Sequence, residues 1–299
     1  MTAPHRFARR HPCATFFALT YAVSWGLWLP VVLGYSGPLR EPLFVAGIFG
    51  PAIAGIGTTW LLGERVGEWL RAAFRWRVPA RWWAVALAVP VALTLTASAA
   101  YALLGHDVDW GLLPARLAAY GPALAVAAVI GGGQEELGWR GFALPRLEAR
   151  FGPAGGTLVL GGAWALWHLP IIAADPDFQH GLGLGALLPV IGLTALSVVG
   201  YAFVLSWVFN RTGSVLVAAL LHGGFNTANG SLVPLAAGAA EGAAYAGLSV
   251  AMTLALAAAV AALLVATRGR LGAAPAQTPP PLGAVPGHKS STAISPSHA

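Results

Sequence analysis

Residues 123–140 read A-L-A-V-A-A-V-I-G-G-G-Q-E-E-L-G-W-R, an apolar run that ends in charged side chains. Its apolar part belongs to a candidate membrane span, and Glu135, Glu136 and Arg140 follow with no polar loop between. A charged side chain at bilayer depth costs several kcal/mol, so such residues are rare there and usually functional. The stretch therefore predicts a membrane protein with a polar site between its helices.

The whole chain has the composition of a polytopic membrane protein. Of its 299 residues 57% are hydrophobic and only 9% are charged, whereas a soluble domain carries about 25% charged residues. A membrane helix needs about 20 mostly apolar residues. The candidate spans are 13–34, 42–63, 82–105, 117–139, 154–173, 184–209, 214–231 and 243–266. We therefore expect an all-α fold of about eight transmembrane helices in one bundle.

The positions of the basic residues predict the orientation of these spans. With both termini in the cytoplasm, all but two of the 17 Lys and Arg residues lie in cytoplasmic segments, and the exceptions are Arg40 and Arg116. This pattern explains the net charge of +6 without a nucleic-acid partner. We expect a multi-pass protein of the cell membrane, in a bacterium the plasma membrane, with the lipid bilayer as its surroundings.

The composition changes along the chain and predicts four parts. Residues 1–12 form a cytoplasmic N-terminus, 13–115 the first three spans, 116–270 a core of five spans, and 271–299 a cytoplasmic tail. The tail contains six prolines and no helical period, so we expect it to be disordered.

A loop between the second and third spans, 65–81, alternates aromatic and basic residues. Two interpretations are open for it. It is either an amphipathic interfacial helix on anionic headgroups or an ordinary basic loop with an aromatic belt.

Two further polar stretches lie in apolar runs. One is W-A-L-W-H at 164–168, and the other is H-G-G-F-N at 222–226. Helix neighbours lie three or four residues apart, so His222 and Asn226 share a face, and Glu136 can pair with Arg140. Glu135 is then the less neutralised carboxylate, which suits a general base or acid. The structural alternative is that both glutamates and Arg140 form one buried, fully hydrogen-bonded network, and that each histidine is only a packing residue.

These residue types fit hydrolysis of an amide bond inside the membrane. Such a reaction needs a base to activate water and donors to stabilise the oxyanion. Glu135 with His168 could activate the water, and His222 with Asn226 could bind the oxyanion. Alternatively, Glu135, His168 and His222 could hold a zinc ion as a His₂Glu site. No H-E-x-x-H motif is present, and the spacing does not choose between the two versions.

The three stretches together resemble the motifs of the CPBP intramembrane proteases. This CAAX-protease and bacteriocin-processing group, also called the Abi family, is related to the Ras-converting CAAX endopeptidase. The resemblance rests on E-E-x-x-x-R at 135–140, an aromatic-x-x-x-H at 164–168 and H-x-x-x-N at 222–226. It implies a helical core with an intramembrane cavity, in which Glu136 and Arg140 support the active site.

The resemblance also implies a role for each remaining motif residue. Glu135 would be the catalytic glutamate and would act on water together with His168, while His222 and Asn226 would form the oxyanion site. Trp164, another supporting residue, occupies a position where the family usually has Phe. The family has been described both as metalloproteases and as glutamic proteases, so a zinc cofactor stays open.

We expect an intramembrane endopeptidase that cleaves a peptide or a membrane protein. The alternatives are a proton- or ion-coupled transporter, since buried Glu, His and Arg also build proton relays, and a non-catalytic scaffold or immunity protein. Straight vertical helices would place Glu135 and His168 at different depths. The two meet only if the glycines at 131–133 bend the fourth span or if 141–156 dips into the membrane.

Overall fold

The computed structural model describes residues 3–173, 184–235 and 243–273. Within these ranges the chain is helical and contains no strand, which confirms the predicted all-α class. The predicted disordered tail, 271–299, lies almost entirely outside the described residues.

The helices follow one another through short connections. The first are α1 (Ala3–Arg10), α2 (Pro12–Val32), α3 (Arg40–Ile48), α4 (Gly50–Leu61), α5 (Val66–Ala73) and α6 (Ala80–Leu103). The middle elements are η1 (Trp110–Leu112), α7 (Leu113–Ile130), η2 (Gly133–Glu135), α8 (Glu136–Gly138), the π-helical turn η3 (Trp139–Ala143), α9 (Leu144–Trp167) and α10 (Leu169–Ala173). The last are α12 (Leu184–Thr212), α13 (Val215–Ser231) and α14 (Ala243–Thr267).

Several helices begin where the sequence provides a start signal. Pro12 and Pro114 lie in the first turns of α2 and α7, where a missing N–H costs nothing. Ser214 caps α13, because its hydroxyl accepts a hydrogen bond from the backbone N–H of Val217 at 3.3 Å. Local chemistry therefore fixes the start of the helix that carries His222 and Asn226.

The described residues contain fewer candidate spans than the eight predicted. Five helical runs are long and apolar enough to cross a membrane, namely Pro12–Val32, Ala80–Leu103, Trp110–Ile172, Leu188–Thr212 and Gly247–Thr267. A sixth arises if α3 and α4, bent by 48° against each other, form one span.

The lower number has two physical causes. The run Trp110–Ile172 has 63 residues, about three times the length of one crossing, and it contains the predicted spans 117–139 and 154–173. In place of the predicted span 214–231, the structure has α13 with only 17 residues. The described residues therefore contain five or six candidate spans, and the number of eight spans stays a prediction.

The long run bends at its glycines. Helix α7 ends at Ile130, and Gly132 adopts φ +117°, a conformation open to glycine but strained for other residues. Two short turns and the π-helical turn η3 then lead into α9, where Gly152 makes a second break with φ +71°. Of the two bends considered from the sequence, the one at 131–133 is present, and it redirects the chain directly before Glu135.

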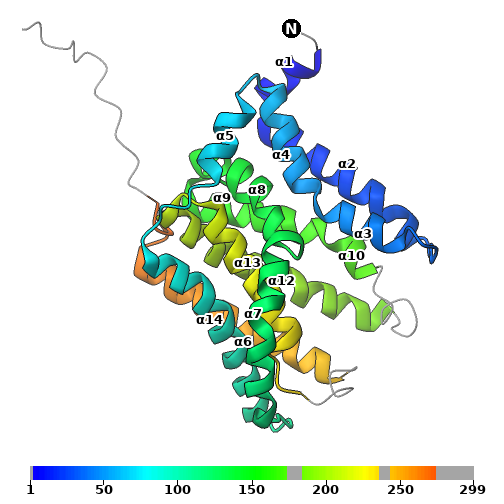
Figure 1. The fold of residues 1–299 in the computed structure, drawn as a ribbon, viewed down its shortest axis with the longest axis vertical. Helices are drawn as coiled ribbons and strands as arrows, with labels where there is room; N and C mark the ends of the chain where they lie inside the picture. Colours follow the sequence, from blue (N-terminus) through cyan, green and yellow to red (C-terminus); the bar gives the residue numbers. More distant parts are fainter. Residues whose placement is uncertain (1–2, 174–183, 236–242, 274–299) are drawn as a thin grey trace, which may run out of the picture.

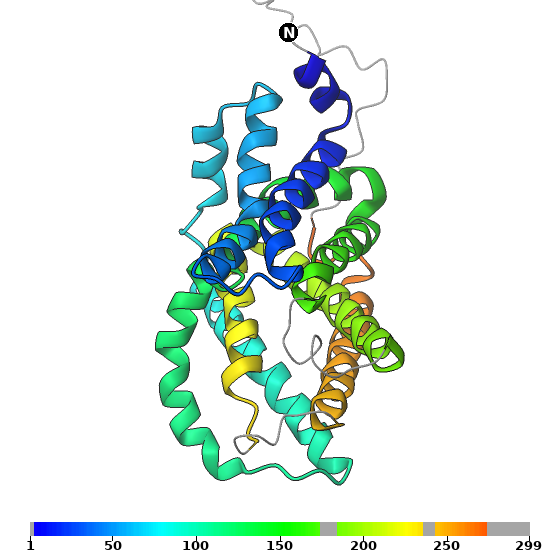
Figure 2. The same ribbon diagram turned by 90° about the vertical axis from the view of Figure 1, so that its right-hand side faces the viewer.

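The elements that carry the first two motifs lie between two groups of helices, and α13, which carries the third motif, belongs to one of these groups. Figure 1 shows α2, α3 and α4 together on one side and α6, α7, α13 and α14 on the other, and Figure 2 shows the same separation. Helix α13 packs against α6, α7 and α12, and also touches η2 and α8. Helix α12 packs against α9 and α14. The three motifs therefore meet where α13 passes the bent segment.

Aromatic side chains connect α2 to the motif elements. Phe16 lies edge-on to Trp139 with ring centroids 5.4 Å apart, and Trp28 lies 4.8 Å from Trp167. All four rings are buried. Helix α2, which precedes the motifs by a hundred residues, thus forms the wall behind them.

Candidate active site

Short, bent elements deliver the candidate residues to one place. Glu135 ends η2, Glu136 begins α8, and Arg140 lies in the π-helical turn η3. The remaining residues come from two long helices: Trp164 and His168 lie at the C-terminal end of α9, and His222 and Asn226 lie in α13.

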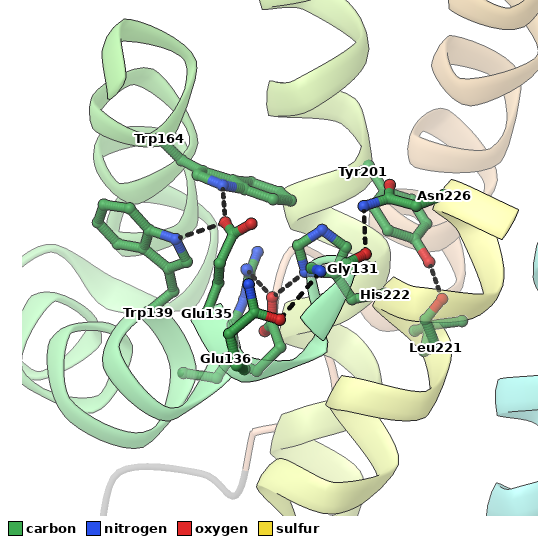
Figure 3. A network of polar contacts seen from close by, with 12 residues as sticks. Gly131, Glu135, Glu136, Trp139, Trp164, Tyr201, Leu221, His222 and Asn226 are labelled. Atoms are coloured by element: carbon green, nitrogen blue, oxygen red, sulfur yellow. Dashed lines mark hydrogen bonds and ion pairs between the residues drawn. The ribbon is translucent and has the colours of Figure 1, made fainter. Parts of the chain in front are cut away.

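Glu136 is the centre of a fully buried cluster. Its Oε1 accepts hydrogen bonds from Arg140 Nη1 at 3.0 Å and from His222 Nδ1 at 2.7 Å (Figure 3). The side chains of Glu136 and Arg140 have no exposed surface. The pair expected from the four-residue spacing is therefore present, and it joins the first motif to the third.

This cluster is incompletely paired. Among the described residues, Glu136 Oε2 and the Nε and Nη2 atoms of Arg140 have no hydrogen-bond partner. The guanidinium carbon of Arg140 lies 4.8 Å from the centroid of a Trp164 ring, within reach of a cation–π interaction. Because the ion pair is buried and only partly satisfied, loss of either charge would be costly.

Glu135 is held by two indole groups. Its Oε2 accepts hydrogen bonds from Trp164 Nε1 at 2.9 Å and from Trp139 Nε1 at 3.2 Å, as Figure 3 shows. Its Oε1 takes no hydrogen bond from any described residue. One carboxylate oxygen is thus fixed, and the other is free to accept a proton or orient a water molecule.

His168 has a defined donor and acceptor side. Its Nδ1 lies 2.8 Å from the backbone carbonyl oxygen of Trp164. A carbonyl can only accept, so Nδ1 carries the proton and donates. In the neutral ring Nε2 then has its lone pair free, which is the form a general base requires.

Asn226 and His222 meet the chain at its glycine bend. Asn226 Nδ2 donates to the carbonyl oxygen of Gly131 at 2.9 Å (Figure 3). A Cβ on Gly132 would lie 2.5 Å from Asn226 Nδ2 and 2.7 Å from His222 Nε2. Two reasons therefore favour glycine at position 132. Its backbone conformation is strained for other residues, and a side chain would collide with Asn226 and His222.

A cavity of about 560 Å³ lies between α6, α9, α12, α13 and α14. Trp164, His168, His222 and Asn226 line one part of it, and Arg116 lines another. This volume is within the range of ligand-binding pockets. Two imidazoles and a carboxamide from two helices thus border a single space.

The structure brings the candidate residues together without placing all of them on the cavity. Glu135 is 4% exposed and is not part of the cavity wall. The ring of Trp164, whose Nε1 donates to Glu135, lies 5.5 Å from the His168 ring and 5.0 Å from the His222 ring, between centroids. Trp164 therefore contacts all three groups.

The arrangement does not fit the zinc site considered from the sequence. Among the described residues, no three His, Cys, Asp or Glu side chains are positioned together as metal ligands. In the expected set, Glu135 Oε2, His168 Nδ1 and His222 Nδ1 are each hydrogen-bonded to a different neighbour. The described residues thus do not form a ready zinc site.

Two residues of the site, Trp139 and Tyr201, and one contact of Gly131 were not predicted from the sequence. Trp139, four residues after Glu135, was an available signal for an i, i+4 contact. Gly131, within the glycine run, supplies the carbonyl that binds Asn226. Tyr201 of α12 donates from its hydroxyl to the carbonyl oxygen of Leu221 at 2.6 Å, and no pattern in the sequence indicated this contact.

The fold and the site together define an all-helical membrane protein with carboxylate, guanidinium and imidazole groups buried between its helices. Residues 117–228, a little over a third of the chain, match the model of the family described as type II CAAX prenyl endopeptidase, Rce1-like. The match includes all three motifs and confirms the resemblance predicted from them.

One curated relative supports the same family. It is named CAAX prenyl protease 2, comes from Methanococcus maripaludis, and is 27% identical over 89 residues. The aligned part covers 29% of this chain and 32% of the relative. The chain thus spans about a third of the length of the curated relative it matches.

Proposed function

We propose that this protein is an intramembrane endopeptidase that hydrolyses a peptide bond of a membrane-associated or small peptide substrate. The observation that carries the proposal is the shared cavity, bordered by His168, His222 and Asn226, with Glu135 hydrogen-bonded to Trp164 of the cavity wall. The family of residues 117–228 supports it, because that family consists of endopeptidases.

The proposed reaction begins with a water molecule between Glu135 and His168. Water gives a proton to one of these two groups, and its oxygen adds to the carbonyl carbon of the substrate. Glu135 Oε1 and His168 Nε2 are suited to this step because neither atom has a hydrogen-bond partner among the described residues.

The oxyanion that forms next would lie near His222 and Asn226. The Asn226 amide has a second N–H besides the one bound to Gly131. His222 donates through Nδ1 to Glu136, so its Nε2 can donate only when the ring is an imidazolium, whose charge Glu136 offsets. The C–N bond then breaks, and the amine leaves with the proton taken from water.

The proposed setting is a multi-pass protein of the cell membrane with eight spans and both termini in the cytoplasm. The candidate spans support a membrane location, and the distribution of arginines favours this orientation. Cysteine labelling of introduced sites on 64–79 and 104–110, from either side of an oriented membrane, tests it.

A cleavage assay tests the activity. The protein, purified into lipid nanodiscs, is incubated with a panel of internally quenched peptides, with and without a prenyl group. We expect cleavage by the wild type and its loss in Glu135→Ala, His168→Ala and His222→Ala.

Two further outcomes are decisive in this assay. Equal turnover by the wild type and the three variants would remove the protease proposal. Loss of wild-type activity with a chelator, restored by zinc, would show that the side chains of Glu135, His168 and His222 move together to bind a metal.

A further inference from the structure

Residues 64–81, here called the α5 segment, join α4 to α6 and present a basic surface. Helix α5 lies beside α4 at one end of the molecule (Figure 2). The exposed arginines of the α5 segment include Arg71, Arg75, Arg77 and Arg81. Phe74 and Trp76 lie among them and are 45% and 66% exposed. Exposed rings between arginines are typical of a surface that meets both headgroups and acyl chains.

The charge of this surface is not neutralised within the described part of the chain. Arg65 pairs with Glu68 at 2.7 Å, and Glu64 pairs with Arg146 at 3.0 Å, so both glutamates of the segment are engaged. None of the ion pairs between described residues includes the four exposed arginines.

The α5 segment also lies at a membrane boundary. It follows α4, half of a bent candidate span, and precedes the candidate span Ala80–Leu103. A connection between two spans runs along the headgroup layer. Its charge complements that of an anionic headgroup, and each Arg near an anionic surface contributes about fivefold in affinity.

The buried side of the α5 segment contacts the elements of the candidate active site. Trp69 Nε1 donates to the carbonyl oxygen of Gly141 in the π-helical turn at 2.9 Å. Ala73 packs in a small apolar cluster with Leu137, which follows Glu136, and Val215, in the first turn of α13.

A second contact reaches the start of α13. The hydroxyl of Ser214, which caps this helix, donates to the backbone carbonyl oxygen of Arg75 at 2.5 Å. One face of the α5 segment thus meets the surroundings, and the opposite face holds the two elements that carry Glu136 and His222.

We propose that the α5 segment is a docking surface for anionic phospholipids of the bilayer, and that their binding stabilises the π-helical turn through Trp69. The proposal does not depend on the protease activity, because both of its readouts are structural.

The lipid preference is measured first. Native mass spectrometry counts the phosphatidylglycerol and phosphatidylcholine molecules that the full-length protein retains from an equimolar mixture. We expect a preference for phosphatidylglycerol that falls about 25-fold in Arg71→Gln/Arg77→Gln. The matched variant Arg268→Gln/Arg270→Gln removes the same charge beyond α14 and should keep the preference. Equal retention of both lipids by the wild type, or equal losses in the two variants, would overturn the docking surface.

The coupling is measured by hydrogen exchange of the backbone amides of 133–143 in nanodiscs with and without phosphatidylglycerol. We expect the lipid to slow exchange severalfold in the wild type. Trp69→Phe keeps the ring but loses the donor to Gly141, so it should keep the lipid preference and lose this protection. Unchanged protection in Trp69→Phe would refute the coupling. If an acidic peptide slowed exchange and phosphatidylglycerol did not, the surface would bind an acidic segment of a partner protein instead of lipid.

Discussion

The candidate site has two neighbouring regions that differ in their access to solvent. On one side, Glu135, Glu136 and Arg140 are buried and bonded to one another or to tryptophans. On the other, His168 and Asn226 border a cavity of about 560 Å³. The two regions are joined by the hydrogen bond between His222 and Glu136 and by Trp164, which contacts Glu135 and both histidines.

The two regions also differ in origin. The buried region comes from the short turns between α7 and α9, where glycine and a π-helical turn replace regular helix. The cavity wall comes from long helices. Irregular backbone is tolerated at membrane depth only where protein covers it or a cavity borders it. The packing of α2 and α4 against this segment provides that cover.

Removing the charge of Glu135 should have the largest effect. Glu135→Gln keeps the shape of the side chain but removes the proposed base, so kcat should fall on the order of 10³-fold while KM stays near the wild-type value. Steady-state cleavage of a quenched peptide measures both. The control is Glu148→Gln, a carboxylate of α9 that binds Asn210 away from the cavity and should keep full activity. A small loss in Glu135→Gln would assign the chemistry to the cavity wall alone.

Neutralising Glu136 should mainly reduce stability. In Glu136→Gln the buried Arg140 keeps its charge without a counter-ion, which should lower the free energy of unfolding by about 3 kcal/mol. Thermal unfolding in nanodiscs of fixed composition measures the loss. Glu68→Gln breaks an exposed ion pair of similar geometry and should change little. Equal changes in both variants would contradict the distinction between buried and exposed pairs.

A side chain at Gly132 should damage the boundary between the two regions. Gly132→Ala is expected to cost about 1–3 kcal/mol in backbone strain, and its Cβ would collide with Asn226 and His222. Thermal unfolding and cleavage should therefore both decline. Gly121→Ala in α7, where an added Cβ meets nothing within 4 Å, is the matched control and should behave like the wild type.

Replacing one indole donor should have the smallest effect and test the connection through Trp164. Trp164→Phe keeps a ring beside Arg140 and both histidines but loses the N–H bound to Glu135, so kcat should fall about tenfold. The matched change Trp167→Phe removes a buried N–H that has no acceptor among the described residues and should leave kcat unchanged. A larger loss in Trp167→Phe would mean that packing, and not hydrogen bonding to Glu135, sets the rate.

The helical class of the fold and one ion pair of the candidate site could be predicted from the sequence. The helical class follows from the apolar runs, and the pairing of Glu136 with Arg140 follows from a four-residue spacing. The glycines at 131–133 indicated a bend at the place where the chain turns. In each case the signal is local, because it lies within one turn or one span.

What the sequence could not provide depends on contacts between distant elements. The hydrogen bond from Trp164 to Glu135 joins residues 29 apart in the chain. The hydrogen bond between His222 and Glu136 joins residues 86 apart in the chain. The described residues give five or six candidate spans where eight were predicted, because the predicted fourth and fifth spans lie in one bent run and α13 is short.

The central claim is that the two regions act in one step, with Glu135 on the buried side and His168 on the cavity side. The most direct test is a double-mutant cycle of Glu135→Gln and His168→Gln, with kcat measured by peptide cleavage in nanodiscs. The account predicts that the double variant is no slower than the slower single variant, because both residues activate the same water. Losses that multiply in the double variant, or full activity in either single variant, would contradict it.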